Sequence, residues 1–191
     1  MSAMTWFDHS TRSIWSQPWG RAILGPLRNV ELRLLPSQIS SWAAWQNEHP
    51  RSLVLVNDIE IAARGAEAYP ANLVVSIELD GERSAFYIGD VIEAGVTNTT
   101  VAGRPVVLWA VEGDYRTYLR QVEDQSLTFE LDGDTITDVE TGSTWDLQRG
   151  LARSGPLAGQ AMQQIPSFTA YDWAWQDFFP DSEIVSVDDP D

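Results

Sequence analysis

Cysteine and lysine are both missing from this chain of 191 residues, and only two histidines occur, His9 and His49. The absence of cysteine excludes disulfides, thiolate nucleophiles and zinc–sulfur sites. The absence of lysine excludes a Schiff base and a phosphate-loop lysine. The chain contains no run of about 18 uncharged apolar residues, the length that a membrane-spanning helix needs. No basic leader precedes an apolar run, so we expect no export signal.

What the chain does contain is apolar and acidic. Hydrophobic residues make up 43% of it, including nine tryptophans, which is enough for a packed core and excludes general disorder. The net charge is −16, distributed as +1 over residues 1–58, −11 over 59–140 and −6 over 141–191. Such a field repels phosphate, so neither nucleic acid nor membrane insertion is expected. A solvated acidic surface, cation binding and a location outside the cell all remain open.

Uncommon residues recur at an offset of 130 positions without gaps. The matching segments are Thr11–Trp15 with Thr141–Trp145, Gly25–Leu27 with Gly155–Leu157, and Ala44–Gln46 with Ala174–Gln176. Pro50 and Pro180 occupy the same register. This pattern predicts an internal repeat, in which each copy is one supersecondary unit.

The repeat organises the predicted fold, a β-rich α+β chain of two tandem units. Each unit has a small antiparallel sheet and one short tryptophan-bearing helix. Residues 1–58 form a partial first unit (strand, Gly-Pro-Leu turn, helix, strand), 59–72 a linker and 73–191 a complete second unit. The helices are expected at 41–49 and 171–179, each stopped by a proline. Asp80-Gly81 and Asp132-Gly133 predict hairpin turns.

The tryptophans divide into repeated and unrepeated positions. Trp15 and Trp145 are equivalent, as are Trp45 and Trp175, and equivalent aromatics favour buried core positions. The unrepeated tryptophans include Trp19, Trp109 and Trp173, the candidate ligand-binding residues for a sugar or an aromatic ligand. A merely half-buried role is the alternative for each of them.

Carboxylates supply weak catalytic candidates. Glu112 and Asp114 follow an apolar strand, and two carboxyls across a cleft could cleave a glycoside. The segment 132–138 carries three aspartates but lacks a full calcium ligand ladder, so a hairpin is expected there. His9 and His49 together with a carboxylate would suit a metal, but a packing or helix-end role is favoured for His49, and we expect no metal site and no cofactor.

Two segments resemble a known family. Asp8–Gln17 and Asp138–Leu147 are similar to its Asp-x-x-Thr-x-Ser-x-Trp motif, and the Gly-Pro-Leu and Trp-Ala elements agree with it. The family is the bacterial and archaeal domain of unknown function three-one-seven-nine, and the resemblance runs from Trp6 to about Val185. Many of its members carry a Cys-x-x-Cys pair where this chain reads Val111–Asp114, so sulfur chemistry is impossible here.

The resemblance implies no assigned activity and favours an extracytoplasmic location. The leading hypothesis is a non-catalytic binding or assembly module. One alternative is an enzyme that uses Glu112 and Asp114 on a carbohydrate or a metal-bound ligand, and another is a degenerate member of a thiol-redox family. The aromatic, nearly neutral first unit favours self-association, and a small ligand or glycan is a further possible partner.

Overall fold

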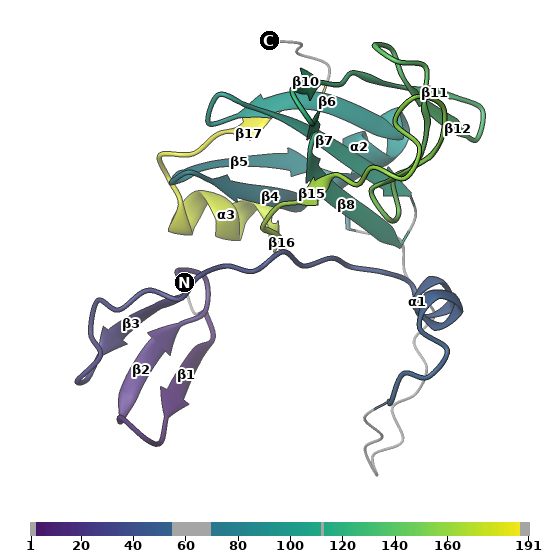
Figure 1. The fold of residues 1–191 in the computed structure, drawn as a ribbon. Coiled ribbons are helices and arrows are strands. Elements are labelled where there is room, and N and C mark those ends of the chain that lie inside the picture. Colours follow the sequence, from purple (N-terminus) through teal and green to yellow (C-terminus); the bar gives the residue numbers. More distant parts are fainter. Residues whose placement is uncertain (1–2, 55–69, 112, 188–191) are drawn as a thin grey trace.

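The computed structural model describes residues 3–54, 70–111 and 113–187, and strands dominate it (Figure 1). The strands are β1 (Thr5–Asp8), β2 (Ser13–Ser16), β3 (Arg21–Leu24), β4 (Leu73–Leu79), β5 (Glu82–Tyr87), β6 (Val96–Val101), β7 (Arg104–Val111), β8 (Asp114–Leu119), β9 (Gln121–Val122), β10 (Gln125–Ser126), β11 (Phe129–Asp132), β12 (Thr135–Asp138), β13 (Thr144–Asp146), β14 (Leu151–Ser154), β15 (Gln163–Gln164), β16 (Ser167–Tyr171) and β17 (Ile184–Val185). The helices are α1 (Trp42–Glu48), α2 (Ile88–Ala94) and α3 (Asp172–Phe178). The expected β-rich α+β class is confirmed. Within the described ranges, no helix is long and apolar enough to cross a bilayer.

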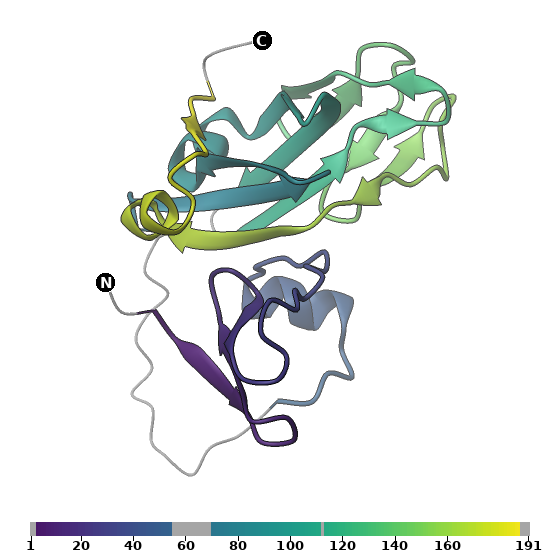
Figure 2. The ribbon, with the colours of Figure 1, turned by 90° about the vertical axis from the view of Figure 1, so that its left-hand side faces the viewer.

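Small sheets are the building blocks. Their strand orders are β16-β4-β5-β17, β15-β8-β7-β6, β11-β12-β13-β14, β1-β2-β3 and β10-β9. The pairs are antiparallel except for β17 on β5. The β1–β2–β3 sheet lies apart from the others, as Figure 2 shows from the side. An extended segment connects this sheet to α1 and crosses beneath the larger sheets (Figure 1).

The main core lies between the sheet of β4 and β5 and the sheet of β6 to β8. Val75 and Phe86 meet Val106 and Leu108 there, all nearly inaccessible to solvent. On the opposite face of the β4–β5 pair, Val74 packs against the helix α3. Because both faces are covered, the apolar run of β4 does not alternate with polar residues.

Two predicted hairpins are present. Leu79 pairs with Glu82 around Asp80 and Gly81, which both have positive φ (49° and 88°). Two consecutive positive φ values characterise the hairpin turns whose twist matches that of the strands. The chain also turns between β11 and β12, where Asp132 pairs with Thr135.

The two predicted helices are also present. The hydroxyl of Ser41 accepts the N–H of Ala44 at 3.2 Å and caps the start of α1. Both α1 and α3 end two residues before a proline. The helix α2 was not expected; it is anchored by buried Ile88 and Val91 and ends at Gly95, whose φ is 71°. The predicted linker lies almost wholly outside the described residues.

The expected burial of all four repeated tryptophans is partly wrong. Trp145 and Trp175 are buried, and Trp15 is half-buried. Trp45, however, is 36% exposed, whereas Trp175 is 1% exposed. Val74 of β4 and Ala85 of β5 cover Trp175 of α3, whereas α1 has no buried residue.

Candidate functional site

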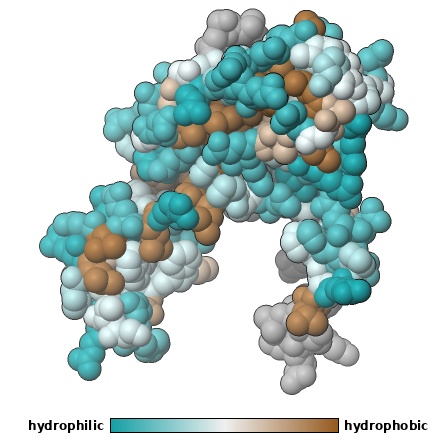
Figure 3. All heavy atoms as spheres, in the orientation of Figure 1, coloured by the Kyte–Doolittle hydropathy of each residue, from teal (hydrophilic) through white to brown (hydrophobic). Residues whose placement is uncertain are grey.

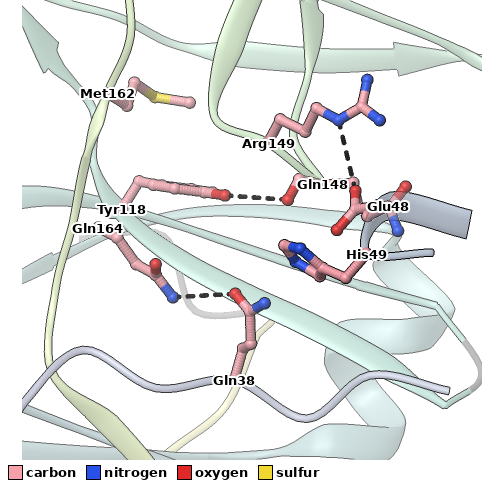
Figure 4. A pocket seen from close by; sticks show the side chains of 8 residues that line it. All are labelled: Gln38, Glu48, His49, Tyr118, Gln148, Arg149, Met162 and Gln164. Carbon is pink, nitrogen blue, oxygen red and sulfur yellow. Dashed lines mark hydrogen bonds and ion pairs between the residues drawn. The ribbon is translucent and has the colours of Figure 1, made fainter. Parts of the chain in front are cut away.

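A polar cavity of about 430 Å³ lies where the end of α1 approaches β8 and the turn before β14 (Figure 4). Its lining residues are Gln38, Glu48, His49, Tyr118, Gln148, Arg149, Met162 and Gln164. They come from the first 50 residues and from the last 80, so the cavity exists only because these parts meet. Amide, imidazole, guanidinium and carboxylate groups give it both donors and acceptors.

Few interactions close the cavity. Arg149 Nε lies 3.4 Å from Glu48 Oε1, and Gln164 Nε2 donates to Gln38 Oε1 at 3.3 Å (Figure 4). Glu48 Oε1 is inaccessible to solvent and makes no hydrogen bond, since its approach to Arg149 has only ion-pair geometry. A buried carboxylate oxygen without a well-aligned donor carries a desolvation cost, which the ion pair with Arg149 offsets in part.

A buried ion pair lies behind the cavity. The guanidinium of Arg116 donates from Nη1 to Asp114 Oδ1, and from Nε to the carbonyl of Gln148 at 3.1 Å. Its Nη1 also lies 3.3 Å from the carbonyl oxygen of Ile39, and its buried Nη2 has no partner. Gln148 Nε2 reaches Asp114 Oδ2 at 3.4 Å, which links the ion pair to the cavity wall.

Burial governs the protonation of this region. It raises the pKa of Asp114, although the neighbouring Arg116 acts in the opposite sense. Burial also raises the pKa of Tyr118, whose hydroxyl therefore stays protonated and donates to the carbonyl of Gln148 at 3.4 Å. Asp114 is paired with Arg116, and it is not among the groups that line the cavity.

A second opening, of about 270 Å³, lies at the end of α3. Trp19 forms its wall: the indole meets the ring of Phe178 edge-on at 5.7 Å and donates from Nε1 to the Phe178 carbonyl at 3.2 Å. The guanidinium of Arg21 lies 5.1 Å from the centre of the Trp19 ring. This opening is more aromatic than the cavity beside α1.

The structure does not bring the sequence candidates together. Trp19 lines the second opening, Trp109 packs partly buried beside the Trp145 cluster, and Trp173 stacks on Tyr171 at 5.9 Å with 49% of its surface exposed. Glu112 lies outside the described residues. Asp114 directly follows the turn of the β7–β8 hairpin, where it pairs with Val111, yet its side chain is buried in the ion pair with Arg116.

Sequence reasoning missed Arg116, Glu48 and Arg149. An arginine inside the otherwise uncharged run Tyr115–Leu119 was the available signal for a buried cation. His49 lines the cavity and packs on Trp45 with ring centroids 4.1 Å apart, in agreement with a packing role. Among the described residues, no three histidine, aspartate or glutamate side chains cluster closely enough to hold a metal ion.

The model of a protein family of unknown function, DUF3179, matches residues 1–64 and 60–182 of the chain. No curated protein and no solved structure matches it significantly.

Proposed function

Because the chain belongs to the uncharacterised family DUF3179, whose model covers almost all of it, we propose from its geometry that it is a non-catalytic assembly module. In this proposal residues 1–58 are a partial copy of the unit that residues 73–191 contain in full. The incomplete copy presents an aromatic surface that another polypeptide covers.

The element bounds support the duplication. Adding 130 to the bounds of β1, β3 and α1 gives those of β12, β14 and α3. Both copies of the strand–turn–strand segment shift register just before the tryptophan, at Ile14–Trp15 and at Thr144–Trp145. Identical irregularities at identical offsets are difficult to explain for unrelated segments.

Hydrogen bonds repeat in the same register. The N–H of Leu27 donates to Ser13 Oγ at 3.1 Å, and the N–H of Leu157 donates to Ser143 Oγ at 3.0 Å. Each of these bonds ties the Gly-Pro-Leu turn to the strand that carries the tryptophan. The serine in each copy thus has one role, which supports a common local structure.

The contrast between α1 and α3 carries the assembly proposal. Trp175 is covered, whereas Trp45 at the equivalent helical position is exposed. Eighteen large apolar side chains are exposed in the described residues, and thirteen of them lie between Met4 and Val54. Exposed apolar surface at this density is typical of an interaction site.

Self-association is one form that this assembly would take. Trp6 and Phe7 lie exposed on β1, in the part of the chain whose net charge is only +1. Two molecules that meet through this sheet would keep their acidic parts apart, which reduces the repulsion between the molecules.

Light scattering after size exclusion tests this proposal with the wild type and the double variant Trp6→Ser/Phe7→Ser. We expect the apparent mass of the wild type to rise with concentration and the variant to stay at the 21.3 kDa monomer mass. Trp173→Ser removes an equally exposed aromatic outside the first copy and is the matched control. A wild type that remains monomeric, or a Trp173 variant as deficient as the double variant, would contradict self-association. If a soluble quencher leaves the fluorescence of the first copy's tryptophans unchanged in the monomer, the proposed exposed aromatic surface is contradicted.

A further inference from the structure

Within the described part of the chain, the extended segment Ser37–Ser41 is hydrogen-bonded along one of its two edges. The carbonyl of Ser37 accepts from Gln164 Nε2 at 3.3 Å, and the carbonyl of Ile39 accepts the N–H of Tyr115 at 3.4 Å. In extended chain, alternate residues direct their main-chain groups to opposite edges. Gln38 and Ser40 therefore face the other way, and no hydrogen bond in the described part of the chain uses the main-chain N–H or C=O of either residue.

The segment 130 residues later is hydrogen-bonded along the edge that corresponds to Gln38 and Ser40. Strand β16 pairs with β4 in a register that places Phe168 opposite Ser76 and Ala170 opposite Val74. The ladder is continued at its two ends, by the N–H of Glu78 on the Pro166 carbonyl at 3.4 Å and by the N–H of Asp172 on the Asn72 carbonyl at 2.9 Å. Phe168 and Ala170 correspond in the repeat to Gln38 and Ser40. Among the residues that the structure describes, the edge that is bonded in the second copy therefore has no partner in the first.

The same missing strands account for the exposed tryptophan. In the second copy, Val74 of β4 and Ala85 of β5 cover Trp175. In the first copy, the contacts of Trp45 with described residues are with neighbours in sequence: its Nε1 donates to Ser52 at 2.8 Å and its ring packs on His49. One pair of strands would both complete the edge and bury the indole.

A hollow adjoins the first copy. Figure 3 shows a hollow that opens to solvent between the lobe of β1–β2–β3 and the lobe of α1, roofed by the connecting segment. Arg33 and Arg51 are exposed on either side of this segment and helix in the chain, where the second copy has Gln163 and Asp181. With Glu31 and Glu48, residues 31–54 carry no net charge, whereas the equivalent residues 161–184 carry −4. An acidic hairpin therefore meets less repulsion in the first copy than the acidic β4–β5 pair meets in the second.

We propose that the first copy binds an acidic β-hairpin of another protein by strand addition. One strand pairs antiparallel with Gln38 and Ser40, and a small apolar side chain of that strand covers Trp45. This proposal rests on the assembly role and names its partner. Another molecule of this same protein cannot donate the hairpin without unfolding, because its β4–β5 pair is buried on both faces.

A synthetic peptide of residues 71–88 is the probe, because it contains the β4–β5 hairpin, carries three acidic residues against one arginine and has no tryptophan. Hydrogen exchange of the full-length protein is measured by mass spectrometry with and without the peptide. We expect exchange in residues 38–48 to slow by at least about tenfold, with a blue shift of the protein's tryptophan emission.

Two controls isolate strand pairing. A peptide with Ser76→Pro loses the N–H that faces the protein but keeps those that face the second strand of the hairpin, so it should give no protection. In the protein, Ser40→Pro removes an N–H that the described chain does not use, and it should abolish protection. Trp45→Ser, which leaves the edge intact, should weaken binding and keeps the test valid if Ser40→Pro fails to fold.

The proposal is overturned if millimolar wild-type peptide leaves residues 38–48 unprotected, protects a different region, or acts no better than the Ser76→Pro peptide. If one of these outcomes occurs but light scattering still shows self-association through β1, the hairpin site is rejected and the assembly role is retained. Conversely, a monomer that binds the peptide at this edge supports the hairpin site and rejects self-association alone.

Discussion

Ser37 and Ser167 bond to each other in both directions. The Ser37 hydroxyl donates to the Ser167 carbonyl at 2.8 Å, and the Ser167 hydroxyl lies 3.4 Å from the Ser37 carbonyl. The two serines are 130 positions apart. Trp19 is equivalent to Arg149 in the repeat, and Glu48 is equivalent to Phe178. Trp19 contacts Phe178 and Arg149 contacts Glu48, so the same two positions meet in both directions. Reciprocal contacts of this kind are the property of a two-fold interface, so the proposed copies face each other as the halves of a symmetric dimer would.

The two helical tryptophans should differ in their contribution to stability. Trp175→Ala removes a fully buried ring and should lower the free energy of unfolding by about 3–5 kcal/mol. Trp45→Ala removes an exposed ring and should cost less than about 1 kcal/mol. Urea denaturation of both variants measures the difference, and equal losses would mean that Trp45 is covered in solution.

Two glycines with similar φ should respond differently to alanine. A Cβ at Gly155 (φ 89°) would lie 2.6 Å from Ser143 Cα, whereas a Cβ at Gly81 (φ 88°) would meet nothing within 4 Å. Gly81→Ala should cost about 1 kcal/mol through backbone strain alone. Gly155→Ala should cost about 2 kcal/mol more, because backbone must move. Thermal unfolding ranks the two, and a similar loss in both would contradict the close approach at Ser143.

Asp114 should make stability depend on pH. Its native pKa is raised, so between the unfolded and the native pKa the folded chain holds more protons than the unfolded chain. Folding then gains stability from this group as the pH falls and loses it as the pH rises through the native pKa. Compared with Asp114→Asn, the wild type should therefore become relatively more stable between pH 7 and about pH 4. Denaturation at several pH values measures this, and the opposite trend would show that Arg116 dominates.

Calcium should not stabilise the turn between β11 and β12. Asp132 and Asp134 flank Gly133 in an ordinary two-residue hairpin, and their side chains are exposed. We expect millimolar calcium to shift the melting temperature by less than about 1 °C. A larger rise that Asp134→Ala abolishes would reveal a calcium site.

Local sequence predicted the elements that local chemistry controls. Asp80-Gly81 determines a hairpin because both residues adopt positive φ, and Pro50 and Pro180 limit their helices. The helix α2 was missed because Gly89 and two β-branched isoleucines have weak helix propensity. In the folded chain, the burial of Ile88 and Val91 outweighs that weak propensity. The exposure of Trp45 could not be predicted, because the same local pattern gives the same helix whatever covers it. The Arg116 site escaped prediction because its partners come from three separate segments.

The placement of Arg116 also bears on how the molecule denatures. Its guanidinium belongs to β8, but Gln148 and Ile39 supply two of the carbonyls that surround it. Loss of the Ile39 segment would leave a buried cation short of an acceptor, which is a large penalty for the remaining core. The proposed copies are therefore coupled through one side chain despite their sequence separation. They should melt in a single cooperative transition, and neither half should behave as an autonomous folding domain.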